Sequence, residues 1–400
     1  MKSWRKIRLG DACKINMDSY SPKEEWDFVN YLDTGNITDN KIDFIQHIDV
    51  KNEKLPSRAR RKVKKDSIIY STVRPNQRHF GIVKSQPENF LVSTGFAVID
   101  TDAQVLDANF LYYLLTQATL VEALHAIAEQ STSAYPSIKP SDIENLKIEI
   151  PDLATQKKIA DVLGSLDRKI TQNTEVNKNL LEQAQSIYSA WFEQFLLSDG
   201  IMPSNWHIGT IRDIADIKTN SFNPQRNPGV MLEHYSIPAF DEQLFPVFEL
   251  SNNVKSNKYI LTNNSVLASK LNPDTKRVWR PMCLSKNAVC STEFIVFEAK
   301  NPEHKDFLFS IIDSQPFSDW MCAHTTGSTN SRQRTTPSTT LDFKIAVAPD
   351  DVVDEFCSTV APMYDLISQN VLENQSLSSL RDQLLPKLMT GEIDVSDIDP

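Results

Sequence analysis

Hydrophobic residues recur with a helical spacing over two long stretches of the chain. The first stretch, residues 155–197, contains no proline and a single glycine, Gly164. Its apolar side chains fit the heptad spacing of a coiled coil. The predicted core residues of the two stretches are, in chain order, Leu163, Leu166, Ile170, Asn173, Asn177, Leu180 and Ile187, and then Ile367, Asn370, Asn374, Leu377 and Leu384.

The second stretch, residues 350–393, contains two prolines. Proline lacks the backbone N–H that a helix uses, and its ring clashes with the preceding turn. Pro362 is therefore expected to break or restart this helix, and Pro386 to kink or end it.

Asparagine occupies the same two core positions in both stretches. Asn173 and Asn177 correspond to Asn370 and Asn374 at an offset of 197. Buried polar residues cost stability but fix the register and the number of partners. We therefore expect the two helices to pair with each other, antiparallel. The alternative is that each helix packs only on its own domain.

The rest of the chain is also duplicated. Residues 66–71 resemble residues 264–269, and residues 93–98 resemble residues 291–296, in both cases at an offset of 198. Short runs with strand character, and apolar runs with helical spacing, recur in the same order. The predicted strands include 67–70, 96–99 and 146–150, and the predicted helices include 109–115 and 307–312.

These patterns predict a mixed α/β (α+β) fold with a pseudo-twofold internal duplication. Two similar globular domains would be separated by two long antiparallel helices that form a coiled coil. A helix of ~35 residues spans roughly 50 Å. The predicted boundaries are 1–152 for the first domain, 153–198 for a central helical region, 199–349 for the second domain, 350–393 for a distal helical region and 394–400 for an acidic tail.

The composition is that of a globular protein, with 40% hydrophobic and 24% charged residues. No apolar run approaches the ~20 residues that span a bilayer, and no signal peptide is evident behind Met1. The five cysteines include no CxxC pair, so we expect reduced thiols, no metal site and a cytoplasmic protein without a membrane partner.

Motifs for catalysis are missing from the sequence. It contains no GxGxxG, no GxxxxGK[ST], no GxSxG, no HExxH and no Asn-Pro-Pro-Tyr motif of base-amino methyltransferases. We therefore expect no catalytic residue and no cofactor in this chain. A degenerate nuclease site among its carboxylates is an alternative.

Polar loops at matching places in the two halves are the candidate binding sites. The net charge of −10 is unfavourable for binding DNA unaided, but residues 51–65 are strongly basic, and local clustering is what attracts phosphates. One loop of each half follows a predicted strand, at 74–79 and 270–280. The other precedes the closing strand, at 131–137 and 325–334. Solvated loops and turns are the alternative interpretation.

Arginine and lysine can pair with guanine edges, and asparagine and glutamine with adenine edges, while other polar groups hold phosphates. The candidate DNA-binding residues are Arg58, Arg60, Arg61, Lys62, Arg74, Asn76, Gln77, Arg78, His79, Ser133, Tyr135, Lys270, Asn272, Lys276, Arg277, Arg280, Asn330, Arg332, Gln333 and Arg334.

Three segments resemble the specificity (S) subunits of type I restriction–modification systems. Residues 380–393, LRDQLLPKLMTGEI, look like the C-terminal signature of that family. Residues 151–163, followed by Asp167 and Ile170, resemble the start of its central conserved helix, and residues 203–206 resemble the entry into its second recognition domain. Thr155-Gln156 departs from the usual Glu-Gln of the family.

The resemblance implies a non-catalytic subunit of a multisubunit adenine methyltransferase and endonuclease. Two target recognition domains would each bind one half of a split, asymmetric sequence in double-stranded DNA. The helices would set the spacing and dock two modification subunits, which carry S-adenosylmethionine. Two restriction subunits, which use ATP and Mg²⁺, could join them. The alternative is a DNA-binding adaptor or scaffold that recruits a nuclease without a methyltransferase partner.

Overall fold

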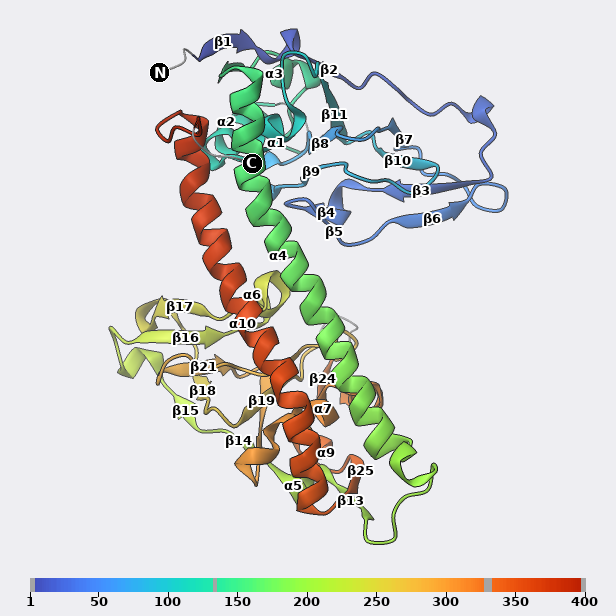
Figure 1. Cartoon of the computed structure of the whole chain (residues 1–400), viewed down its shortest axis with the longest axis vertical. Helices are drawn as coiled ribbons and strands as arrows, with labels where there is room; N and C mark the ends of the chain where they lie inside the picture. Colours follow the sequence, from blue (N-terminus) through green and yellow to red (C-terminus); the bar gives the residue numbers. More distant parts are fainter. Residues whose placement is uncertain (1–3, 132–134, 327–332, 397–400) are drawn as a thin grey trace. The chain divides into compact units, whose positions relative to one another are not determined.

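The computed structural model describes residues 4–131, 135–326 and 333–396. The chain divides into two compact units, which we call unit 1 (Met1–Lys169 and Ser376–Pro400) and unit 2 (Ile170–Gln375). The division passes through both long helices, so each unit contains a part of each helix (Figure 1). The C-terminal residues thus belong with the N-terminal domain.

In its described residues, unit 1 contains two four-stranded sheets, a two-stranded ribbon and a two-stranded hairpin. One sheet is antiparallel, in the order β2 (Cys13–Ile15), β11 (Phe96–Thr101), β8 (Ile68–Ser71) and β9 (Phe80–Ile82). The other has the order β6 (Gln46–Asp49), β3 (Phe28–Leu32), β10 (Phe90–Ser93) and β7 (Ala59–Lys62), with β10 parallel to β3. The ribbon pairs β1 (Arg5–Arg8) with β12 (Lys147–Ile150), and a short hairpin pairs β4 (Ile37–Thr38) with β5 (Lys41–Ile42).

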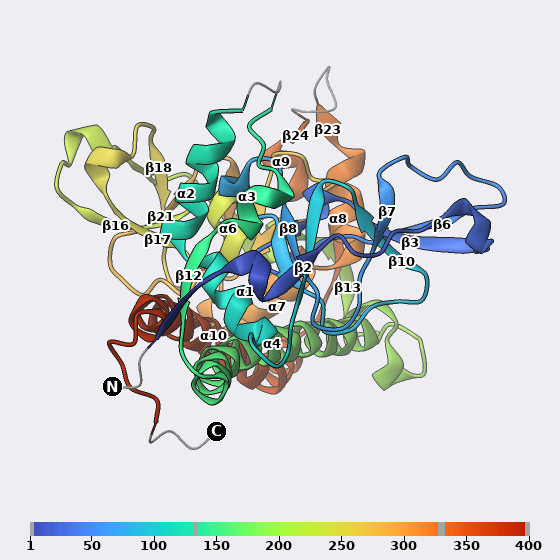
Figure 2. The same cartoon turned by 90° about the horizontal axis from the view of Figure 1, so that it is seen from above.

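Three helices complete this domain: α1 (Ala108–Thr116), α2 (Ala118–Glu129) and α3 (Pro140–Glu144). Helix α1 begins where Asp107 accepts a hydrogen bond from the Phe110 N–H at 3.0 Å, the usual N-cap arrangement. Nearly all of its side chains are buried, because it lies between β8 and the long helix α4 (Figure 2). The predicted strands at 67–70, 96–99 and 146–150 and the helix at 109–115 are confirmed within one or two residues.

Unit 2 repeats this arrangement. Its antiparallel sheet has the order β14 (Ala215–Lys218), β22 (Phe294–Ala299), β19 (Ser265–Ser269) and β20 (Val278–Trp279). Its mixed sheet has the order β15 (Ser221–Phe222), β18 (Lys258–Ile260), β21 (Ala288–Ser291), β16 (Met231–Tyr235) and β17 (Val247–Leu250). Here β21 is parallel to β16, as β10 is to β3. The internal duplication is therefore confirmed, with β15 as an addition in unit 2.

Some of the smaller elements of unit 2 also have counterparts in unit 1. A ribbon pairs β13 (His207–Thr210) with β25 (Lys344–Val347), as β1 pairs with β12. A second short ribbon pairs β23 (Thr325–Thr326) with β24 (Arg334–Thr335). The helices are α5 (Ile211–Ile214), α6 (Ile237–Gln243), α7 (Lys305–Ile312), α8 (Gln315–Ala323) and α9 (Pro337–Thr340). Helix α7 confirms the predicted helix at 307–312.

The two long helices are α4 (Leu153–Tyr188) and α10 (Asp350–Met389). In unit 2 their segments lie side by side and run in opposite directions (Figure 1). Asn173 pairs with Asn374, whereas Asn177, further along α4, pairs with Asn370, which comes earlier in α10. The antiparallel pairing is therefore confirmed. Each helix also packs on a domain core, so the two alternatives are not exclusive.

None of the twelve predicted coiled-coil core residues is exposed. Asn173 and Asn370 are only 4% and 8% exposed. The heptad therefore identified the buried face of both helices, including its polar positions.

One prediction about the second long helix was wrong. Pro362 does not break α10, which continues from Asp350 to Met389. The exposed pyrrolidine ring removes one backbone hydrogen bond, but Phe356, Val360 and Tyr364 are buried in the core of unit 2 and hold the helix on both sides of it. Pro386 lies close to the end of α10 at Met389, and the kink expected there stays a prediction.

The first long helix ends earlier than the predicted 197. After Tyr188 the chain forms a π-helical turn, Ser189–Glu193, which places Phe192 in the core of unit 2. Phe195 then adopts a left-handed backbone conformation with φ 52°, and this ends the helical path. Among the described residues, no single helix is both long and apolar enough to cross a membrane.

The C-terminal signature residues contribute to the core of unit 1. Leu388 and Met389 are buried there, and the backbone of Gly391 lies against the Trp4 ring. The described part of the predicted acidic tail is also fixed: Val395 is buried, and Lys158 Nζ donates to the Ser396 carbonyl oxygen at 2.7 Å.

Candidate nucleic-acid interface

In unit 1 the two candidate loops are joined by backbone hydrogen bonds. The Arg74 N–H donates to the Pro136 carbonyl oxygen at 2.9 Å, and the Ile138 N–H donates to the Thr72 carbonyl oxygen at 2.8 Å. Val73 and Ser137 form a β-bridge between these bonds. We call residues 72–79 and 135–138 loop pair 1.

Unit 2 contains the same arrangement. The Asn272 N–H donates to the Gln333 carbonyl oxygen at 2.9 Å, and the Thr335 N–H donates to the Lys270 carbonyl oxygen at 3.0 Å. Leu271 and Arg334 form the matching β-bridge. We call residues 270–280 and 333–335 loop pair 2. The sequence placed the loops at equivalent positions, and the structure brings the two loops of each half together.

Both loop pairs contain a residue in the left-handed backbone region at the same position. Arg74 has φ 48° and Asn272 has φ 47°. Side chains with a Cβ rarely adopt this region, and asparagine tolerates it better than arginine does. Such strain persists where the surroundings enforce it, and it is concentrated at functional sites.

Several predicted side chains of unit 1 are exposed around this position. The Arg74 guanidinium lies over the Tyr135 ring, 5.2 Å from its centroid. Asn76 and Gln77 form the exposed tip of the same loop. Among the described residues, no carboxylate forms an ion pair with Arg74. Loop pair 1 therefore presents one arginine and two amides to solvent.

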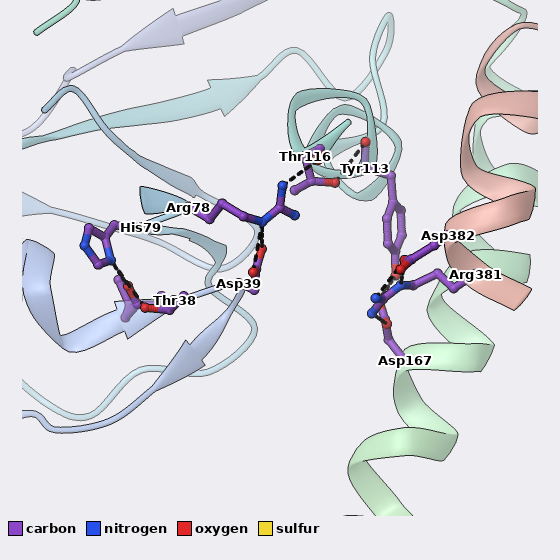
Figure 3. Close-up of polar contacts among 10 residues, drawn as sticks. Thr38, Asp39, Arg78, His79, Tyr113, Thr116, Asp167, Arg381 and Asp382 are labelled. Atoms are coloured by element: carbon purple, nitrogen blue, oxygen red, sulfur yellow. Dashed lines mark hydrogen bonds and ion pairs between the residues drawn. The ribbon is translucent and has the colours of Figure 1, made fainter. Parts of the chain in front are cut away.

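Arg78 and His79 fasten the loop to the domain (Figure 3). Arg78 Nε lies 2.7 and 2.9 Å from the two Asp39 carboxylate oxygens, and Arg78 Nη1 donates to the Thr116 carbonyl oxygen at 3.4 Å. His79 Nδ1 lies 2.6 Å from the Ile37 carbonyl oxygen. These contacts give both residues a structural role, and their predicted DNA contacts remain predictions.

The basic stretch, residues 51–65, includes β7 and the residues on both sides of it. Lys62 Nζ contacts a Glu24 carboxylate oxygen at 2.5 Å and lies over the Trp26 ring. This hydrogen bond raises the pKa of Lys62 and lowers that of Glu24. Arg58 is exposed, whereas Arg60 and Arg61 are half-buried. Part of the positive charge is therefore neutralised within the fold.

Four predicted cations of unit 2 form ion pairs. They are Lys276 with Asp313 at 2.9 Å, Arg277 with Asp241 at 2.6 Å, Arg280 with Asp306 at 2.7 Å, and Arg334 with Glu293 at 3.0 Å. The hydrogen bond from Arg334 lowers the pKa of Glu293. Lys270, Asn272 and Gln333 remain half-exposed. The predicted residues Ser133, Asn330 and Arg332 lie outside the described residues.

The sequence did not single out a polar cluster between α1 and the long helices of unit 1. The Tyr113 hydroxyl donates to Asp167 Oδ2 at 2.6 Å, and Arg381 Nη1 donates to Asp167 Oδ1 at 2.8 Å (Figure 3). Arg381 occupies a heptad core position, and a charged residue there could have indicated a buried partner. Within the described ranges, no three His, Cys, Asp or Glu side chains could hold a metal ion.

Comparisons with known proteins agree with this architecture. Residues 1–183 match the family of the type I restriction modification DNA specificity domain. The HindI specificity subunit of Haemophilus influenzae is 24% identical, over 98% of this chain and 100% of its own. The MjaIX specificity subunit of Methanocaldococcus jannaschii is 25% identical, over 73% of this chain and 70% of its own. The solved S subunit from M. genitalium is 17% identical, covering 97% of this chain and 96% of its own, with a TM-score of 0.58, which is a likeness of fold.

Proposed function

Because residues 1–183 match the type I restriction modification DNA specificity domain and a specificity subunit aligns over 98% of this chain, we propose that the chain is such a subunit, which binds a bipartite, asymmetric DNA sequence and docks methyltransferase subunits. Its two domains would act as target recognition domains, one for each half of the sequence. The chain itself would carry out no chemistry.

The observation that carries this proposal is the pair of equivalent loop pairs with different side chains. Loop pairs 1 and 2 share their backbone hydrogen bonds and their left-handed residue. They differ in the side chains they present, with Arg74, Asn76 and Gln77 in one and Lys270, Asn272 and Gln333 in the other. One backbone framework carrying two sets of side chains is suited to reading two unlike half-sites.

Loop pair 1 and the basic stretch would divide the binding between them. Arg58, Lys64 and Lys65 are exposed cations of this stretch and would hold phosphates. Phosphate contacts set position, whereas the loop side chains would contact base edges. With a net charge of −10, binding by the isolated chain should be weak and strongly dependent on salt. Partner subunits would supply further positive surface.

The helices of unit 2 offer a surface for a protein partner. Val176 on α4 and Leu366 and Leu372 on α10 are exposed apolar side chains. Exposed apolar side chains that form a contiguous patch are typical of interaction sites, and a partner that covers these helices would bury all three. We propose that modification subunits dock on these helices. Those subunits would bring S-adenosylmethionine and the methyl transfer to adenine, and restriction subunits would bring ATP and Mg²⁺.

The test of the proposed function is to express the full chain with its cognate modification subunit and to map methylated adenines. We expect one non-palindromic motif in two parts. Replacing residues 1–150 with the matching segment of a relative should change one part and leave the other. Methylation without a motif, or a motif that survives the exchange unchanged, would contradict the proposal.

A second test separates docking from DNA reading. Val176→Asp and Leu372→Asp place charges on the exposed helix face and should weaken co-purification of the modification subunit. Glu182→Gln, an exposed change on α4, is the matched control. If the chain copurifies with a nuclease but never with a methyltransferase, the adaptor alternative replaces this proposal.

A further inference from the structure

The residue in the left-handed conformation differs between the two loop pairs, although its surroundings are the same. Arg74 and Asn272 are 198 positions apart, the offset of the duplication. Each follows a serine whose hydroxyl bonds the backbone just ahead: Ser71 Oγ donates to the Val73 carbonyl oxygen at 2.9 Å, and Ser269 Oγ donates to the Leu271 carbonyl oxygen at 3.0 Å. Two unlike side chains therefore start from the same backbone position.

The other end of each loop is anchored in the same way. Arg78 Nη1 donates to the carbonyl oxygen of Thr116, the last residue of α1. Lys276 Nζ donates to the carbonyl oxygen of Asp313, just after α7. Arg78 and Lys276 are again 198 positions apart. These cations bind a helix C-terminus, where unpaired carbonyl groups attract positive charge. They hold the loop, and the left-handed residue between the two anchors is free to differ.

The side chains of Arg74 and Asn272 make few contacts within the fold. Arg74 is exposed, and its guanidinium lies over the Tyr135 ring. Asn272 is half-exposed, and its Oδ1 is buried but has no hydrogen-bond partner within the described ranges. By contrast, Arg277, Arg280 and Arg334 each form an ion pair with a carboxylate. A side chain that makes few contacts within the fold, on a backbone held in one conformation, is suited to hydrogen bonding with the edge of a base.

We propose that Arg74 and Asn272 are equivalent base-reading residues, with Arg74 reading a guanine in one half-site and Asn272 an adenine in the other. This inference rests on the proposed function. The guanidinium forms two parallel hydrogen bonds with guanine O6 and N7, and the amide forms two with adenine N6 and N7. The difference between the two halves at this one position would contribute directly to the asymmetry of the recognised sequence.

The test exchanges the two side chains in the full chain, expressed with its cognate modification subunit, and maps methylated adenines. In Arg74→Asn, one guanine of the first part should be replaced by adenine or lose its preference by about tenfold or more, while the second part stays unchanged. In Asn272→Arg, one adenine of the second part should shift to guanine. Lys147→Gln, at an exposed position on β12, is the control and should leave the motif as it is.

Arg74→Gly distinguishes readout from loop geometry, because glycine adopts the left-handed region freely. It should keep the thermal unfolding midpoint while losing selectivity at the same base pair. A wild-type motif that Arg74→Asn, Asn272→Arg and Arg74→Gly all leave unchanged would overturn this inference alone. An equal loss of binding to all sequences would make these residues phosphate contacts and would also overturn it. A wild type without any bipartite motif would overturn the proposed function, and this inference with it.

Discussion

Asn173 Nδ2 on α4 donates a hydrogen bond to Asn374 Oδ1 on α10 at 2.9 Å. The equivalent bond of the other repeat is also present, with Asn370 Nδ2 donating to Asn177 Oδ1 at 2.8 Å. Exchanging the two helices thus reproduces the same contact, so the duplication is expressed as a local twofold relationship in unit 2. A slip by one heptad would place Asn173 opposite Ile367 or Arg381 instead of Asn374, and the amide pairs therefore fix the register.

Replacing one amide of this pair should destabilise the fold. In Asn173→Leu, Asn374 Oδ1 and Glu373 Oε2 lose their shared donor. Loss of a buried hydrogen-bond donor should lower the free energy of unfolding by about 1–3 kcal/mol in urea denaturation. The double variant Asn173→Leu with Asn374→Leu should recover most of this loss, because it also removes the Asn374 acceptor, while Glu373 is exposed to solvent. A single variant as stable as the double variant would contradict the pairing.

The Arg381–Asp167 ion pair should contribute to the stability of unit 1. Arg381→Met removes one hydrogen-bond partner of Asp167 and leaves the Tyr113 hydroxyl in place. Both side chains of the ion pair are about one-third exposed, at 31% and 34%, so solvent weakens the loss, which should be about 1–2 kcal/mol. Asp382→Asn removes the exposed partner of the same arginine and should change the free energy of unfolding by less than about 0.5 kcal/mol. Equal effects of the two variants would count against a role for the Asp167 contact.

Pro362 should cost α10 stability despite the continuous helix. It is exposed and lies within Asp350–Met389, away from either end. Pro362→Ala restores a backbone donor and removes the steric clash, and should raise the free energy of unfolding by about 1–3 kcal/mol. Pro386→Ala, close to the helix end, should have a smaller effect. A destabilised Pro362→Ala would mean that the ring itself packs favourably.

Lys305 should make stability depend on pH in the alkaline range. Burial, with the nearby charge of Arg280, lowers the pKa of Lys305 to about 8. An unfolded lysine has a pKa of about 10.4, so between these values the unfolded state binds more protons than the folded state does. The free energy of unfolding should therefore rise as the pH increases from about 8 to 10.

Lys305→Met provides the reference, because it removes this titration and leaves that of the other groups. The free energy of unfolding of the wild type minus that of the variant should increase by about 1–3 kcal/mol over this pH range. A difference that does not vary with pH would show that the Lys305 pKa is not lowered.

The sequence predicted the features that depend on local pattern. The heptad at 163–187 identified the buried face of α4, and the offset of 198 identified equivalent loops. Whether an arginine or lysine forms an ion pair within the fold depends on residues far away in the sequence. The local sequence pattern therefore does not predict it. Arg78 binds Asp39, which is 39 positions away, and Arg280 binds Asp306 across another loop.

The predicted break at Pro362 failed for a related reason. A proline costs a helix about 3 kcal/mol, and the sequence alone does not show how much tertiary packing offsets this cost. Phe356, Val360 and Tyr364 are buried around it, and each contributes about 1.5–3 kcal/mol of apolar burial. Packing of these side chains in the domain core therefore outweighs the low helix propensity of proline.

The central claim is that the paired helices set the distance between two DNA-reading domains. It is tested most directly by measuring the gap between the two parts of the methylated motif. One heptad would be inserted after Asn177 in α4 and one before Asn370 in α10, which keeps the amide pairs in register. Seven residues add about 10 Å of helix, or roughly three base pairs. We predict that the gap between the two parts of the motif lengthens by about that amount while both parts keep their sequences. A double insertion variant that still methylates at the original gap would contradict the account.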